Sequence, residues 1–181
     1  MDSSTRDAFL KTIPHLRAFA ISLTSNPESA DDLVQETLMR GLTHIHRFEP
    51  GTNVQAWLFT ILRNQFYTSY RKRRRETEDP DGALAGKLAV VPSQHARLDY
   101  EDMRAALASL APRQREAILL IGAEGLTYEE AARVCQTSVG TIKSRVNRAR
   151  TRLAELLAID KDHDLGPDPW LQSVSYVGLA A

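Results

Sequence analysis

Cysteine is nearly absent from this chain. Cys135 is the only one among 181 residues, which excludes an internal disulfide framework and indicates a reducing compartment. Its place at a predicted helix end is typical of a small buried hydrophobe rather than a reactive thiol. No signal-peptide pattern is present, and no apolar run approaches the length of a membrane span. We therefore expect a soluble, cytoplasmic protein with no membrane partner.

Patterns typical of catalysis are also missing. The sequence contains no P-loop, no nucleophile elbow and no paired carboxylates at catalytic spacing. His44 and His46 lie two positions apart, a spacing that does not converge on a metal ion from a helix, and no cysteine or carboxylate cluster completes a site. We expect no metal, no cofactor and no enzymatic activity.

Net charge is absent as well, because 23 Lys and Arg residues balance 23 Asp and Glu residues. No global field therefore steers the chain toward nucleic acid, and its charge is local. Five consecutive cations, RKRRR at residues 71–75, are followed at once by an acidic stretch. Strand signals are missing too, so the helical periodicity predicts an all-α fold.

The helical stripes fall into two groups, which predict two small helical domains at residues 1–75 and 98–160. Residues 76–97 lack periodicity and predict a flexible linker, and residues 161–181 form a tail that is either disordered or docked on the body. In the first domain we expect a helix that Pro14 interrupts, a second helix that begins after Asn26, a turn at residues 48–53 and a third helix over residues 54–75. The second helix should bury Leu33, Val34, Leu38, Leu42 and Ile45, and the third Val54, Trp57, Leu58 and Ile61.

The second domain should contain helices at Tyr100–Leu110 and Pro112–Glu124, followed by a helix-turn-helix. Thr127 and Glu130 have the spacing of a capping box, and Ser138 suits the N-cap of the second helix of the motif. Gln136 stands where such turns often carry Gly, which predicts a slightly strained turn with positive φ.

The second helix of this motif has one apolar and one polar face. Val139, Ile142, Val146 and Ala149 form a core stripe. Short polar side chains and cations on the opposite arc suit base edges and phosphates. The alternative is an amphipathic helix with a solvated basic face, which we disfavour because caps, spacing and charge sign agree. The outward arc contains Gly140, Thr141, Ser144, Asn147 and Arg148, flanked by Lys143, Arg145, Arg150 and Arg152.

The third helix of the first domain carries a different pattern. Arg63, Tyr67, Tyr70 and Arg74 share one face, and Phe59 should lie near it. Aromatic rings interleaved with cations suit the stacking of unpaired bases. Tyrosines that merely cover the surface or pack on another helix explain the pattern equally well.

Acidic residues begin the second helix of the first domain. Asp31 and Asp32 are explained by the helix macrodipole alone. Glu36 lies too far along the helix for that account, so a basic protein partner is the alternative.

Taken together, the two domains resemble a known family. ADDLVQETLMRG followed by FEPGTNVQAWLFTILRNQFYTSYRKRRR resembles region 2 of the bacterial extracytoplasmic-function (ECF) sigma factors. LASLAPRQREAILLIGAEGLTYEEAARVCQTSVGTIKSRVNRARTRL resembles their region 4. The segments SYRKRRRE, GAEGLTYEEAA and VGTIKSRVNRAR are similar to the general-stress-response group of alphaproteobacteria.

The resemblance implies a role for each surface. Region 2 would bind the β′ clamp helices of RNA polymerase and a flipped base of the promoter −10 element, and region 4 would bind the β flap and the −35 element. A small helical anti-sigma factor would bind the chain and keep it inactive. The free chain would be a monomer. The implied polymerase-binding residues are Asp31, Asp32, Leu33, Gln35, Glu36, Met39 and Arg40. The implied −10 residues are Phe48, Asn53, Arg63, Asn64, Tyr67, Tyr70 and Arg71, and the −35 residues are Ser138, Thr141, Lys143, Ser144, Arg145, Asn147 and Arg148.

We therefore expect a sigma factor that directs promoter-specific initiation, with general stress genes as its targets. The main alternative is a stand-alone helix-turn-helix regulator, which would bind promoters tightly without polymerase, typically as a dimer. No dimerisation heptads are present, which disfavours it. A module that only sequesters an anti-sigma factor would not need both basic faces, and a nuclease would need metal or acid–base residues.

Overall fold

The computed structural model describes residues 3–76 and 96–157, with side chains from 3–72 and 102–157, and these ranges contain helices and turns but no strand. The chain divides into two compact units, Met1–Gly86 and Lys87–Ala181. The all-α prediction with two small helical domains is confirmed. Nearly all of the predicted linker and the whole predicted tail lie outside the described residues. Among the described helices, none combines the length and apolar character that a bilayer crossing requires.

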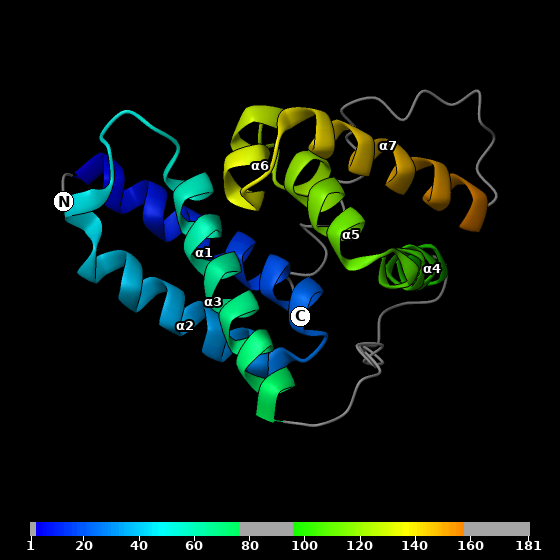
Figure 1. The fold of residues 1–181 in the computed structure, drawn as a ribbon, viewed down its shortest axis with the longest axis horizontal. Coiled ribbons are helices and arrows are strands. Elements are labelled where there is room, and N and C mark those ends of the chain that lie inside the picture. The colour runs from blue at the N-terminus through cyan, green and yellow to red at the C-terminus, as the bar shows by residue number, and fades with distance from the viewer. Residues whose placement is uncertain (1–2, 77–95, 158–181) are drawn as a thin grey trace. The chain divides into compact units, whose positions relative to one another are not determined.

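Unit 1 is a bundle of three helices, α1 (Ser3–Thr24), α2 (Pro27–Thr43) and α3 (Val54–Glu76), each of which packs on the other two (Figure 1). Phe19 of α1 meets Phe59 of α3 edge to face, with ring centroids 4.9 Å apart. Burial of these two large rings fixes α3 against α1. The other fully buried apolar side chains of this unit are Leu16, Ala20, Ala30, Leu58 and Leu62.

Helix α1 corrects the expectation that Pro14 interrupts it, because the helix runs without a break from Ser3 to Thr24. Proline removes one backbone hydrogen bond, the one that would reach the carbonyl of Leu10. Leu10 is 55% exposed, so water can reach this flank of the helix. Burial of Phe9 and Leu16 on either side of the proline keeps both halves docked on the bundle.

Helix α2 ends at Thr43 and is followed by a short 3₁₀ helix, η1 (Ile45–Arg47). The prediction that Leu42 is buried is wrong, since it is 52% exposed. The small residue Gly41 is buried instead, beside Leu58 and Phe9. A Cβ there would lie 2.9 Å from Leu58 Cδ2 and 3.1 Å from Phe9 Cζ. Leu33 and Val34 are buried as predicted, whereas Leu38 and Ile45 are half-buried.

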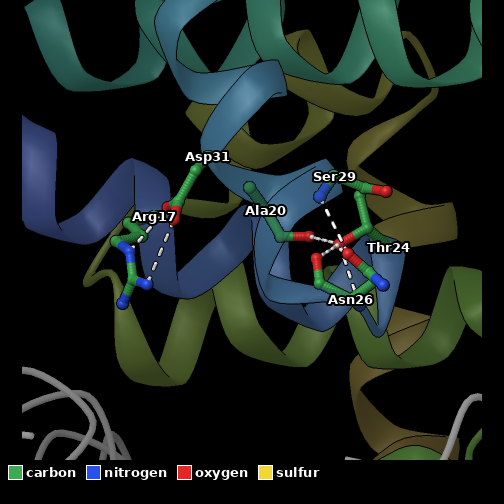
Figure 2. Close-up of polar contacts among 6 residues, drawn as sticks. All are labelled: Arg17, Ala20, Thr24, Asn26, Ser29 and Asp31. Carbon is green, nitrogen blue, oxygen red and sulfur yellow. Dashed lines mark hydrogen bonds and ion pairs between the residues drawn. The ribbon is translucent and has the colours of Figure 1, made fainter.

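The loop between α1 and α2 is short and held by side chains (Figure 2). Asn26 caps α2 as predicted, its Oδ1 accepting a hydrogen bond from the Ser29 N–H at 2.9 Å. Ser25 adopts a left-handed conformation, with φ of 56°. Thr24 Oγ1 donates to the carbonyl of Ala20 at 3.0 Å. These contacts set the angle at which α2 leaves α1.

Helix α3 begins after the predicted turn and differs from expectation at Phe59. This residue is fully buried against Phe19, not on the predicted aromatic and cationic face. Periodicity alone placed it about one turn before Arg63, but α1 packs close enough to enclose it. Val54 and Leu58 are buried as predicted, while Trp57 and Ile61 are half-buried.

Unit 2 contains α4 (Ala96–Ser109), α5 (Pro112–Ile118), a π-helical turn η2 (Leu119–Ala123), α6 (Tyr128–Cys135) and α7 (Val139–Leu156). Helix α4 begins four residues before the predicted start at Tyr100. An apolar cluster joins α4 and α5 to α7, and its buried members are Met103, Ala106, Leu107, Leu110, Ile118, Ala149 and Leu153.

The predicted single helix Pro112–Glu124 is wrong beyond Ile118, where the backbone widens into η2. The Glu124 N–H donates to the carbonyl of Leu119 at 3.0 Å, a five-residue step instead of four. Gly125, with φ of +67°, then lets the chain turn toward α6. Helical periodicity does not distinguish an α-helical from a π-helical turn, so the spacing could not predict η2.

Candidate functional site

The helix-turn-helix of unit 2 is built as predicted. Thr127 Oγ1 accepts from the Glu130 N–H at 3.1 Å, and Glu130 Oε2 accepts from the Thr127 N–H at 2.8 Å, which closes the capping box. Ser138 Oγ accepts from the Thr141 N–H at 3.2 Å and caps α7. Between them Gln136 has φ of 51° and ψ of 51°, the left-handed conformation expected at that position. These local signals fix the angle between α6 and α7.

Helix α7 buries its apolar stripe and exposes its polar arc. Ile142, Val146 and Ala149 are at most 1% exposed, while Val139 is half-buried. The opposite face can therefore enter a groove without disturbing the core. Of the predicted −35 residues, Ser138, Lys143, Ser144, Asn147 and Arg148 are exposed, whereas Thr141 and Arg145 are half-buried.

Contacts within unit 2 divide these seven residues further. Ser138 Oγ and Thr141 Oγ1 lie 2.8 Å apart, so these hydroxyls already bind each other and the helix start. Nη1 of Arg145 is buried. Lys143 Nζ lies 5.7 Å from the ring centroid of Tyr128 on α6, a cation–π contact the sequence did not suggest. Ser144, Asn147 and Arg148 are therefore the best candidates among the seven to contact base edges.

The aromatic and cationic face of α3 is closely packed. The guanidinium carbon of Arg63 lies 4.7 Å from the ring centroid of Tyr67. Phe66 makes an edge contact with Tyr67 at 5.3 Å and stacks on Tyr70 at 6.3 Å between centroids. Arg71 Nε donates to the carbonyl of Tyr67 at 3.2 Å. The structure thus brings Arg63, Tyr67 and Tyr70 together as predicted, with Phe66 as their unpredicted support.

The remaining predicted −10 residues are placed differently from one another. Phe48 is 9% exposed and packs on Trp57, with ring centroids 5.4 Å apart. Asn53 Oδ1 accepts from the Gln55 N–H at 3.0 Å and from the Ala56 N–H at 3.3 Å, so it caps α3. Asn64 is exposed. Phe48 and Asn53 therefore hold the loop and the helix start, while Asn64 presents its amide at the surface.

Helix α2 exposes most of the predicted polymerase-binding residues. Met39 is 69% exposed, an unusual position for a large apolar side chain. Glu36 Oε1 accepts from Arg40 Nη2 at 2.6 Å, four residues along the helix. Leu33 is 9% exposed and belongs to the core. Asp32 and Gln35 complete the exposed set.

Asp31, the last of the predicted polymerase-binding residues, forms an ion pair with Arg17 of α1 (Figure 2). Arg17 Nε donates to Asp31 Oδ1 at 2.7 Å. This hydrogen bond raises the pKa of Arg17 above its usual value and outweighs burial, which lowers it. The side chains are 41% and 45% exposed, so solvent screens the pair and its contribution to stability is small. Asp31 therefore joins α1 to α2 in addition to any role toward a partner.

A pocket of about 350 Å³ opens between α2, η1 and α3. Glu36, Arg40 and Arg47 lie on one wall, and Trp57 and Gln65 on the other. The sequence pattern assigned no role to Arg47 or Gln65. Nothing in the local sequence signals this pocket, because it arises only when α2 packs against α3.

Metal ligands do not cluster in the part of the chain that the structure describes, where no group of three His, Cys, Asp or Glu residues is placed to hold an ion. The rings of His44 and His46 stack with centroids 6.2 Å apart. Nδ1 of His44 lies 3.0 Å from the carbonyl of Arg40, which fixes that ring at the end of α2.

Both units match known protein families, one family to each unit along the chain. Residues 9–76 match the Sigma-70 region 2 family, and residues 100–153 match the Sigma-70 region 4 family. The first range contains all the candidate −10 and polymerase-binding residues, and the second contains all the candidate −35 residues.

Individual relatives extend the likeness to nearly the whole chain. The ECF RNA polymerase sigma factor EcfG of Rhodopseudomonas palustris is 56% identical over 174 residues, covering 96% of each chain. The ECF RNA polymerase sigma factor SigC of Mycobacterium tuberculosis is 37% identical, covering 81% of this chain and 80% of its own. Among solved structures, the sigma factor RpoE of Bartonella quintana, in complex with the anti-sigma factor NepR, is 51% identical with a TM-score of 0.78. That match covers 88% of this chain and 100% of RpoE.

Proposed function

The chain belongs to the ECF sigma factors of the sigma-70 family, and we propose that it confers promoter specificity on RNA polymerase through two separate DNA-binding surfaces. The observation that carries this proposal is the ordered match of region 2 and region 4, one to each structural unit. Sigma factors are initiation factors, not enzymes, and we infer that the polymerase supplies all the chemistry while this chain supplies recognition.

Helix α7 recognises the −35 element in this proposal. Its exposed Ser144, Asn147 and Arg148 have the chemistry to contact base edges in the major groove. Lys143, held near Tyr128, contacts the phosphate backbone. The short helix α6 packs against α7 and supports it from the other side.

The surface of α3 binds the −10 element after the strands separate. Tyr67 and Tyr70 offer rings on which unpaired bases stack, and Arg63 adds a cation beside them. Phe48 and Asn53 act by holding the preceding loop. In this proposal, region 2 acts on the separated strands and region 4 recognises the duplex.

The exposed stripe of α2 binds the polymerase. Met39 supplies the apolar centre, and Asp32, Gln35, Glu36 and Arg40 surround it with polar and charged groups. Such a patch, apolar at its centre and polar at its rim, is typical of protein interfaces. Since Asp31 is paired with Arg17, its contribution is mainly to orient α2.

The chain is controlled by an anti-sigma factor in this proposal, which is supported by its likeness to RpoE of Bartonella quintana, solved in complex with the anti-sigma factor NepR. We expect a small helical inhibitor that covers the surfaces used by polymerase, and a monomeric sigma factor in its absence. The likeness of three segments to the general-stress-response group supports stress genes as the targets.

A binding assay separates this proposal from a stand-alone regulator. Fluorescence anisotropy of a labelled promoter fragment is measured with the chain alone, with core polymerase alone, and with both. We expect specific, salt-resistant binding only when both are present. Tight specific binding by the chain alone, unchanged by polymerase, would support the stand-alone regulator.

A further inference from the structure

Gly140 is an exposed glycine in the first turn of α7. Its backbone is helical, and its φ is not positive. Apart from its chain neighbours and the backbone of its own helix, a Cβ built there would meet only Ser138 Oγ, at 4.0 Å, within the described ranges of the chain. Alanine would therefore fit, and it favours a helix more than glycine does. Glycine at this position weakens the helix, and neither crowding nor backbone conformation requires it.

Other glycines of the chain do meet such a requirement. At Gly41 a Cβ would lie 2.9 Å from Leu58 Cδ2, so the close packing of α2 on α3 needs the missing side chain. Gly51 and Gly125 have φ of 88° and 67°, a conformation that side chains disfavour. Gly140 meets neither condition. We propose that its requirement is external: Gly140 is the point at which α7 comes closest to −35 DNA, and its missing side chain sets the depth of the helix in the major groove.

This geometry rests on the proposed −35 role of α7, and the exposed face of the helix supports it. Gly140, Ser144 and Asn147 recur at steps of four and three, so they lie along one face. Side chains lengthen along this face, from none at Gly140 to a hydroxymethyl group and then an amide, with the long Arg148 beside the amide. Short side chains suit the end of the helix nearest the DNA, whereas longer ones bridge a wider gap. Helix α7 therefore enters the groove tilted, with its first turn deepest.

The first turn of α7 is too firmly held to move aside for an added side chain. Ser138 Oγ accepts from the Thr141 N–H at 3.2 Å, and the two hydroxyl oxygens lie 2.8 Å apart. Ile142 is fully buried, and its N–H donates to the carbonyl of Ser138 at 3.1 Å. A methyl group added at Gly140 therefore moves the DNA away from the helix.

A greater separation weakens base contacts more than phosphate contacts. Hydrogen bonds tolerate a spread of only about 0.5 Å in donor–acceptor distance, and the short side chains of Ser144 and Asn147 cannot extend to restore it. Lys143 has a flexible four-carbon stem that can still reach a phosphate. An added methyl group at Gly140 should thus lower sequence discrimination more than overall affinity.

A glycine without any role is the alternative, and stability distinguishes the two. If nothing outside the chain approached Gly140, alanine would strengthen α7 and leave DNA binding unchanged. If DNA fills the space, alanine strengthens α7 and weakens binding. An ordinary packing defect lowers stability and binding together, so opposite changes in the two quantities identify a steric contact with DNA.

The experiment uses holoenzyme formed from core polymerase and the full chain. Fluorescence anisotropy measures its affinity for a duplex promoter fragment with an intact −35 element and for one in which that element is scrambled. Gly140→Ala should bind the intact element about tenfold more weakly, the loss expected when one base contact is broken, and the scrambled element almost as well as the parent. Thermal unfolding of the free variant, followed by circular dichroism, should occur at the temperature of the parent or higher.

Methionine placed at either end of the same face tests the tilt. Gly140→Met should weaken binding to the intact element more than alanine does, because its side chain is larger. Thr151→Met places the same side chain about 16 Å further along the helix. Thr151 is exposed and lies outside the candidate −35 set, so its replacement should leave both affinities unchanged.

The parent holoenzyme separates the proposed function from this docking geometry. If the parent binds both fragments equally, the −35 role of α7 fails and the geometry fails with it. If the parent discriminates and Gly140→Ala discriminates as strongly, the geometry alone is overturned. Equal losses for Gly140→Met and Thr151→Met would show that Gly140 is not the closest point, and they overturn the geometry equally.

Discussion

The two proposed DNA-binding surfaces differ in how many contacts their side chains already make within the chain. On α7, Ser144, Asn147 and Arg148 project from a helix whose opposite stripe is buried at Ile142, Val146 and Ala149. On α3, the ring of Tyr67 already lies against Arg63 and Phe66, and Tyr70 stacks on Phe66. One surface presents hydrogen-bonding groups to solvent, and the other presents a preassembled group of rings and cations.

This difference matches the two states of promoter DNA. Base edges in the major groove of an intact duplex need polar side chains that extend into the groove. Unpaired bases need flat, rigid surfaces, because stacking gains most when the ring is already ordered. The comparison implies that α7 discriminates sequence in duplex DNA, and that α3 stabilises DNA after the strands separate.

The strongest test of the comparison removes the rings of α3. Tyr67→Ala with Tyr70→Ala should reduce open-complex formation by about 1–3 kcal/mol for each base that loses its stacking partner. Binding of core polymerase should remain intact, because neither residue lies on the exposed stripe of α2. Permanganate footprinting should show reduced thymine reactivity in the −10 region.

A matched control replaces the same residues with Phe, which keeps the rings and removes only the hydroxyls. That variant should melt promoters almost as well as the parent. A template with a premelted bubble should rescue much of the alanine defect. If the bubble gave no rescue, the rings would not act in melting and the contrast with α7 would fail.

A second test divides the α7 surface itself. Arg148→Ala should weaken −35 binding by about 1–3 kcal/mol and relax sequence preference, because it removes a candidate base-edge contact. Lys143→Ala should weaken binding to specific and scrambled DNA alike and lower the salt slope by about one. Titrations at several salt concentrations, with holoenzyme and both DNAs, separate the effects. Equal losses on both DNAs for both variants would show that the face is assigned wrongly.

A third test concerns the polymerase-binding surface proposed for unit 1 in addition to its proposed DNA surface. Met39→Ala should weaken polymerase binding by about 1–2 kcal/mol, the value expected when a partly buried apolar side chain is truncated. Leu42→Ala is the matched control, since Leu42 is 52% exposed on the same helix but lies outside the proposed set. Surface plasmon resonance with core polymerase measures both. Equal losses would contradict the proposed set and extend the interface to Leu42, near the end of α2.

The smallest expected effect is on stability, and it concerns one strained loop residue in each unit. Ser25 and Gln136 are the non-glycine residues with positive φ in the described part of the chain, one in each unit. Relief of left-handed strain by Gly is worth about 1–2 kcal/mol, and the added freedom of the unfolded chain offsets about 0.5–1 kcal/mol of it. Ser25→Gly and Gln136→Gly should each give a modest net gain, read separately by amide hydrogen exchange in α2 and α7. A loss at Gln136 would mean that its side chain stabilises the turn.

Local chemistry explains why so much of unit 2 was predictable. The capping box at Thr127, the cap at Ser138 and the positive φ at Gln136 depend on neighbours within four residues, so the sequence contains the whole interaction. The polar arc of α7 follows from the same helical spacing, whereas its role at the −35 element is implied by the resemblance to region 4. The π-helical turn at η2 was not predictable, because one extra residue per turn leaves no pattern in a short apolar run.

Packing explains what was missed in unit 1. Leu42 is exposed and Phe59 is buried because of how closely α1, α2 and α3 approach, which Gly41 permits. The pairing of Arg17 with Asp31 joins residues 14 positions apart and has no periodic signature. The pocket beside Trp57 depends on the same packing, so spacing along one helix reveals only half of it.

The central claim is that both surfaces act on one promoter through RNA polymerase. Run-off transcription with core polymerase tests it most directly, using one promoter and versions in which the −35 or the −10 element is scrambled. The account predicts a transcript that requires this chain and is lost when either element is scrambled. It also predicts that a premelted bubble restores transcription from the −10 version but not from the −35 version. A chain that binds the promoter tightly alone and yields no transcript with polymerase would contradict the account.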